Sequence, residues 1–125
     1  MKIFLGAFLF CLTIVNPALP ETTTVIVTGY GVNPKSATQH AWKLAISQSV
    51  GKIVDSSVVI ENDQLIKDEV LAFSKGFIDS FEVLETSSEN GLVMVKIQAV
   101  VTTEQLESKL VEIGVHSIDV DGGSL

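Results

Sequence analysis

The stretch GFIDSFEVLETSSENGLVMVKIQAVV, residues Gly76 to Val101, predicts a β-hairpin and so decides most of the fold. The pair Asn90-Gly91 lies near its centre, and both residues tolerate positive φ, which favours a tight reversal. On either side, apolar and polar residues alternate with the period of a strand. Phe81 and Val83 on the first strand are expected to fill the core. On the second strand, five apolar residues are expected to face the same side of the sheet: Val93, Val95, Ile97, Ala99 and Val101.

The chain before this hairpin begins with a predicted strand and a predicted helix. Thr22 to Tyr30 is rich in β-branched residues and has the period of a strand. Asn33 offers a side-chain cap, and Pro34 suits the first helical position. Apolar residues at helical spacing then form one face: Ala37, Ala41, Trp42, Leu44, Ala45, Ile46 and Val50. The small alanines would let this helix lie close to a sheet.

A second helix is expected just before the hairpin, after a segment that the sequence leaves open. Residues 58–60 fit either a short edge strand or an extended connector. Asn62 or Asp63 then offers a cap for the helix. Its apolar stripe faces the core and has four members: Ile66, Val70, Phe73 and Phe77. Gly76 is expected to end this helix.

A third helix is expected after the hairpin, because Thr102 and Gln105 have the spacing of a capping box. Its core stripe has three members: Leu106, Leu110 and Ile113. The order of elements is then β-α-(β)-α-β-β-α. This order predicts an α+β fold: a single small domain with a mixed sheet of about three to four strands, a C-terminal β-hairpin and two to three helices packed on one face.

Residues 1–20, MKIFLGAFLFCLTIVNPALP, have the layout of a secretory signal peptide. Lys2 supplies the positive charge, and an apolar run extends from Ile3 to Val15. The run is too short to span a bilayer comfortably, and an uncleaved anchor is the alternative interpretation. Residues 21–114 are then expected to form an α/β envelope module without a transmembrane span. Residues 115–125 are expected to form a tail, with room for one short strand before the chain becomes disordered.

The net charge and the single cysteine exclude several classes of function. The chain carries 15 acidic residues against eight lysines and no arginine, which gives a net charge of −7. Without a basic cluster, binding to nucleic acid or to anionic lipid is not expected. Cys11 lies inside the apolar run, so the exported domain would have no disulfide, thiol nucleophile or thiolate metal site. Such a domain fits a bacterial periplasm better than an extracellular animal setting.

No group of residues has the pattern of a catalytic or metal site. His40 and His116 are the only histidines, whereas a metal site needs several ligands at helical or turn spacing. Three acidic pairs fall where a helix start or a solvent-exposed face places carboxylates: Glu61/Asp63, Asp68/Glu69 and Asp79/Glu82. We therefore expect no enzyme activity, no cofactor and no metal. Tyr30 and Trp42 are the candidate interaction surface.

Four segments follow one another in the order of a known family: GYG, ATQHAWKLAISQSVG, DSSVVIENDQLIKDEVLAFSKGFIDSFEVL and NGLVMVKIQAVV. Over residues 24–102 the chain resembles the N-terminal domain of flagellar assembly protein T and the related LPP20-type exported lipoproteins. Residues 62–101 are the most specific part of the resemblance. The resemblance implies a periplasmic α/β module. In the flagellar case it implies a part of the ring around the basal body, next to the outer membrane.

Two functional hypotheses follow. The first is a non-catalytic periplasmic or cell-envelope module that acts by protein–protein interaction, with envelope or flagellar proteins or with itself as a homo-oligomer. Its contact surface would be an exposed sheet edge, which can add a strand from a partner, or the region of Trp42. The alternative is a small-ligand carrier with a pocket lined by Tyr30, Trp42 and phenylalanines. Such a pocket needs a cavity of roughly a few hundred Å³.

Overall fold

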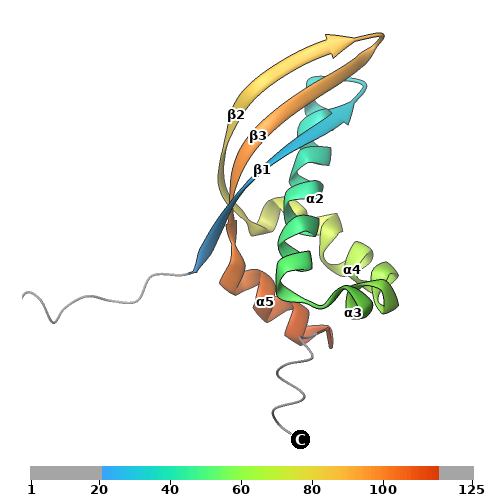
Figure 1. Ribbon diagram of the computed structural model, residues 1–125, viewed down its shortest axis with the longest axis vertical. Helices are drawn as coiled ribbons and strands as arrows, with labels where there is room; N and C mark the ends of the chain where they lie inside the picture. The colour runs from blue at the N-terminus through green and yellow to red at the C-terminus, as the bar shows by residue number, and fades with distance from the viewer. Residues whose placement is uncertain (1–20, 116–125) are drawn as a thin grey trace, which may run out of the picture.

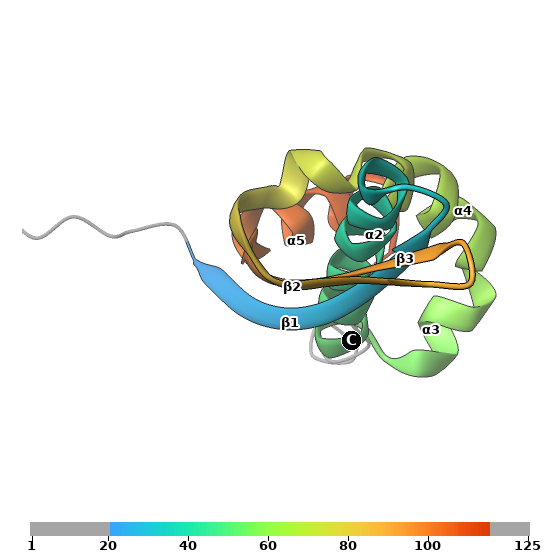
Figure 2. The ribbon, with the colours of Figure 1, turned by 90° about the horizontal axis from the view of Figure 1, so that it is seen from above.

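Three strands form an antiparallel sheet, and the longest helix lies against one of its faces (Figures 1 and 2). The computed structural model describes residues 21–115, so the expected signal peptide (residues 1–20) and the expected tail strand lie outside the described residues. The predicted α+β fold class is confirmed. Within the described range, the sheet is antiparallel throughout rather than mixed.

The central strand of the sheet is β3, and the predicted hairpin places it there. β2 (Ile78–Glu89) and β3 (Leu92–Thr102) are joined by Asn90 and Gly91, whose φ angles are 54° and 80°. Asparagine and glycine tolerate these positive values, so the predicted turn is confirmed. β1 (Thr22–Gly31) pairs with the other side of β3. β1 and β2 thus run parallel with β3 between them, which makes every pairing antiparallel.

The longest helix, α2 (Pro34–Ile53), packs closely on β1 and β3. At its start, the Asn33 side chain accepts a hydrogen bond of 2.8 Å from the Ser36 amide, as the predicted cap requires. The alanines of its inner face are fully buried. At Gly29 on β1 there is no room for a side chain, because a Cβ there would overlap the backbone of α2. Small residues on both elements therefore allow the close approach.

Helix α3 (Ser56–Glu61) occupies the segment that the sequence leaves open. Both expectations for residues 58–60, an edge strand and an extended connector, are wrong. The amides of Val58 and Val59 donate to the carbonyl oxygen of Asp55 at 3.0 Å, and both side chains pack partly buried against the core. In a strand, consecutive side chains would point to opposite faces. Packing of both valines therefore overrides their preference for strands.

The expected second helix is interrupted. α4 (Asp63–Glu69) ends at Val70, and the chain continues as the 3₁₀ helix η1 (Leu71–Phe77). Val70 is buried as predicted, but Phe73 is 62% exposed, so its assignment to the core stripe is wrong. A 3₁₀ helix has three residues per turn, so a stripe spaced for an α-helix turns away from the core there. Gly76 lies inside η1 and does not end an α-helix.

Helix α5 (Thr103–Glu112) follows β3 directly and closes one end of the core. Leu106 and Leu110 are buried, as the predicted stripe requires. The hydroxyl of Thr102 donates to the carbonyl oxygen of Phe77 at 3.0 Å. Thr102 makes no side-chain hydrogen bond to the helix amides, so the predicted capping box does not form. None of the helices within residues 21–115 has the length and apolar character needed to cross a membrane.

Candidate interaction surface

Strand β2 forms one edge of the sheet and is open to solvent along its length (Figure 1). β3 pairs with one side of β2, and no strand within residues 21–115 pairs with the other side. The strand has 12 residues, and every residue after Ile78 is exposed. Natural proteins usually shorten or cover such edges, because unpaired backbone groups are a template for another strand. An edge of this length is therefore a candidate site for a partner.

The apolar half of β2 faces the helix side of the sheet but is only partly covered. Phe81 lies opposite Ala99 and Val83 lies opposite Ile97, and both residues of β3 are fully buried. Residues directly opposite share a face of the sheet, yet Phe81 is 41% exposed and Val83 is 49% exposed. The prediction that these two residues fill the core is therefore wrong. The reason is that α2 packs mainly on β1 and β3 and leaves much of β2 open.

The opposite face of β2 carries carboxylates. Glu82, Glu85 and Glu89 lie opposite positions of β3 that point away from the helices. A register shift after Val83 inserts Leu84, which is 44% exposed. The edge thus presents an apolar face, an acidic face and unpaired backbone on the same strand.

Trp42 on α2 contacts the start of the uncovered strand. Its ring stands edge-on to Phe81, with centroids 5.5 Å apart and an interplanar angle of 75°, a favourable geometry for two aromatic rings. The ammonium group of Lys75 on η1 lies 5.4 Å from the centroid of the Trp42 ring, within the range of a cation–π contact. The indole N–H is enclosed and has no acceptor among residues 21–115. Trp42 therefore connects α2, η1 and β2.

A groove of about 640 Å³ lies beside Trp42, between α2 and η1. Trp42 and Lys43 border it from α2, and Phe73 and Lys75 border it from η1. The remaining lining residues are Gln39, His40, Leu71, Ala72, Ser74 and Gly76. Two lysines and one histidine line the groove and no carboxylate does. The groove is therefore cationic and aromatic in a chain whose net charge is −7.

Tyr30 meets the same region from the end of β1. Its side chain is 47% exposed, and its backbone N–H donates to Nδ1 of His40 at 2.9 Å. The rings of Tyr30 and His40 are tilted, with centroids 6.5 Å apart. Contrary to the prediction, Tyr30 does not line the groove: Trp42 lines it directly, and Tyr30 only contacts His40, which lines it. Sequence reasoning names an exposed sheet edge without identifying it as β2, and it does not place Phe73 or Lys75 beside Trp42.

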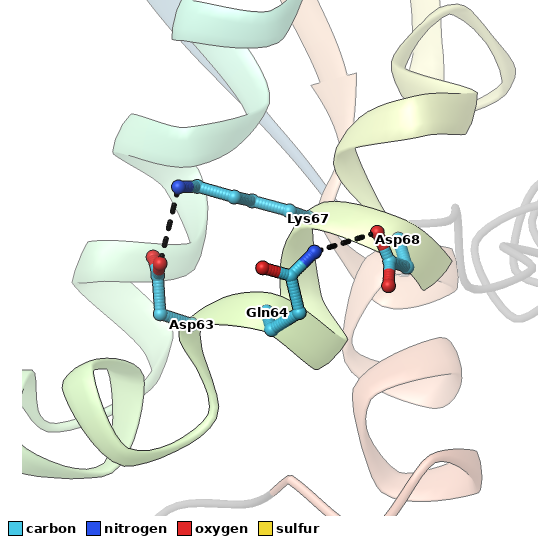
Figure 3. Close-up of polar contacts among 4 residues, drawn as sticks. All are labelled: Asp63, Gln64, Lys67 and Asp68. Atoms are coloured by element: carbon cyan, nitrogen blue, oxygen red, sulfur yellow. Dashed lines mark hydrogen bonds and ion pairs between the residues drawn. The ribbon is translucent and has the colours of Figure 1, made fainter.

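Of the acidic residues considered as catalytic candidates, Asp63, Asp68 and Glu69 lie on α4. Figure 3 shows Asp63 paired with Lys67 at 3.1 Å and the side-chain amide of Gln64 donating to Asp68 at 3.0 Å. Both pairs are four residues apart, the spacing that places side chains together on a helix surface. Neither carboxylate lines the groove. Within residues 21–115, no group of three or more His, Cys, Asp or Glu residues is placed to hold a metal ion.

Comparison with known proteins adds no assignment to this surface. No protein-family model, no curated protein and no solved structure matches the chain. A function must therefore be inferred from the exposed strand β2, from the groove beside Trp42 and from the sequence.

Proposed function

We propose that this chain is a non-catalytic module of the cell envelope that binds another protein through strand β2. The observation that carries this proposal is the open edge: one side of a 12-residue strand has no partner strand within residues 21–115, and both of its faces are exposed. A strand from another protein would pair with the free backbone groups of β2 and continue the sheet. Phe81 and Val83 would be covered at the same time.

Apolar burial favours β2 over the other edge of the sheet. Full burial of an apolar side chain of this size contributes about 1.5–3 kcal/mol. Phe81 is 41% exposed and Val83 is 49% exposed, so about 1 kcal/mol for each remains available to a partner. On β1, by contrast, Val25 is already buried under α2 and Val27 is partly buried against the core. On the helix-facing side, a strand added to β1 would therefore cover less apolar surface than one added to β2, whereas Ile26 on the other side of β1 is 53% exposed.

A location in the envelope is supported by the sequence. Residues 1–20 have the pattern of a signal peptide, and residues 24–102 resemble the N-terminal domain of flagellar assembly protein T. By that resemblance, the partner is an envelope or flagellar protein in a basal-body ring or another assembly at the outer membrane. An exported domain that offers a long open edge suits such an assembly.

A photo-crosslinking amino acid at Leu84 tests the proposal in the native cell with the full chain. Leu84 is 44% exposed on β2, so benzoylphenylalanine at this position would reach a strand that binds there. The same amino acid at Ile60, which is 73% exposed on α3, is the matched control. We expect a discrete adduct of higher mass from position 84 and none from position 60. Equal labelling from both positions, or no adduct from either, contradicts the proposal.

The groove beside Trp42 supports a second candidate, a carrier of small ligands. Its volume of about 640 Å³ lies within the range of ligand sites. The aromatic rings of Trp42 and Phe73, with two lysines nearby, suit an anionic aromatic compound. Trp42 is the single tryptophan of the chain, so its emission reports on the groove. Anilinonaphthalene sulfonate should quench it saturably in the wild type and less in Phe73→Ala, whereas unsaturable quenching in both proteins would reject the carrier.

A further inference from the structure

We infer that the partner of β2 is an extended segment with apolar side chains on one face and lysine or arginine on the other. This inference rests on the proposed function. One face of β2 presents Phe81 and Val83, and the opposite face presents Glu82, Glu85 and Glu89. Side chains of a strand alternate between its two faces, so a strand paired with β2 meets both sets at once. The two faces together therefore define the chemistry of the occupant.

Negative charge on β2 is concentrated and only partly offset. Residues Ile78–Glu89 contain four carboxylates, with Asp79 in addition to the three glutamates, and no basic residue. The ion pairs recorded within residues 21–115 lie on α4 and α5, so these carboxylates take part in neither. Lys96 on β3 lies opposite Glu85 and offsets part of the charge. Basic side chains on an added strand would face the remaining carboxylates, and opposite charges at cross-strand positions favour pairing.

The same carboxylates argue against a second copy of this chain as the occupant. In an antiparallel contact between two copies of β2, the register that sets Phe81 opposite Val83 also sets Glu82 opposite Glu82. A register shifted toward the hairpin turn sets Glu85 opposite Glu89 instead. Like charges directly opposite each other destabilise a strand pair. A basic partner avoids this repulsion, whereas a homodimer in either of these two registers introduces it.

A fluorescein-labelled peptide of alternating valine and lysine is the probe, and fluorescence anisotropy with the full chain measures its binding. The test variant carries two charge reversals on β2, Glu82→Lys and Glu85→Lys. The control variant carries two charge reversals elsewhere, Glu61→Lys and Glu107→Lys. The last two glutamates are exposed on α3 and α5, so both double variants carry the same net charge. We expect the reversal on β2 to weaken binding at least about tenfold and the reversal on the helices to leave it within about twofold of the wild type. Circular dichroism confirms that each variant is folded.

A second peptide, of alternating valine and glutamate, provides the reciprocal test. It should bind the β2 reversal more tightly than it binds the wild type, because the charges of the two strands are exchanged. Equal weakening of the lysine peptide by both double variants would overturn the inference, since it would reveal attraction to net charge alone. Tighter binding of the glutamate peptide to the wild type would also overturn it.

Photo-crosslinking at Leu84 separates failure of this inference from failure of the proposed function. An adduct from position 84, together with no binding of the lysine peptide, retains β2 as the contact strand and rejects only the basic partner. No adduct from position 84 and no binding of the lysine peptide reject both proposals.

Discussion

Replacement of Gly29 by alanine tests the close contact that sets the position of α2 over the sheet. A Cβ at Gly29 would lie 2.8 Å from Cα of Ala41, and closer still to the Ala37 carbonyl oxygen and the Ala41 amide nitrogen. All three are backbone atoms of one helix, so no side-chain rotation relieves the overlap. The helix must therefore move away from β1.

We expect this substitution to lower the free energy of unfolding by about 3 kcal/mol. Inserting an extra carbon into a well-packed core costs about 1–3 kcal/mol, and the upper end applies because backbone atoms must shift. Displacement of α2 also disturbs Ala37 and Ala41, which are fully buried. Small domains are stable by about 5–15 kcal/mol, so the variant would fold but with a large part of its stability lost.

Urea unfolding followed by circular dichroism measures this change. For a denaturant slope of about 1–3 kcal/mol per M, the midpoint should fall by about 1–3 M. Gly51→Ala is the control, because Gly51 lies in α2, the helix that Gly29 contacts, and an added Cβ there meets no atom within 4 Å. Alanine in a helix interior is better than glycine by about 0.5–1 kcal/mol, so the midpoint of this control should rise. A Gly29→Ala variant as stable as the wild type would refute the close packing of α2 on β1.

Two further predictions concern stability and use the same urea assay. Ile97 and Val83 lie opposite each other, but Ile97 is fully buried and Val83 is 49% exposed. Ile97→Ala should cost about 2–5 kcal/mol and Val83→Ala under about 1 kcal/mol; equal losses would contradict an uncovered β2. Asn33→Ala should cost about 1 kcal/mol, because the Ser36 amide loses its acceptor, whereas Asn33→Asp should retain most of the stability. An unchanged midpoint for Asn33→Ala would show that the cap contributes nothing.

The hairpin and the start of α2 could be predicted because a few adjacent residues determine them. Asn90 and Gly91 adopt the positive φ angles that the turn requires, and few other residues do so at low cost. Asn33 and Pro34 begin α2 by the same kind of local chemistry. These signals need no knowledge of the rest of the fold.

How far the helices cover the apolar face of β2 could not be predicted from the alternation of its residues alone. The pattern shows that Phe81 and Val83 share a face with core residues, but it does not show how far α2 extends over that face. One signal was present: after Leu84 the strand reads ETSSE and has no apolar residue. A strand buried on one face would continue its alternation, so this run indicates an edge open to solvent.

The groove beside Trp42 could be predicted only in part. Trp42 and Tyr30 are recognisable as large aromatic residues near the same helix. Phe73 and Lys75 reach the groove because the chain changes from an α-helix to a 3₁₀ helix after Val70. That change depends on tertiary packing, and an apolar stripe with helical spacing does not reveal it.

Hydrogen exchange of the full chain, with and without the valine–lysine peptide, tests most directly the claim that β2 is the binding edge. Amides of β2 that point away from β3 have no partner strand within residues 21–115 and should exchange rapidly in the free chain. Binding of the peptide should slow exchange in residues 79–89 and leave β1 unchanged. Slower exchange confined to β1, or to α2 and η1 without a change in β2, would contradict the claim.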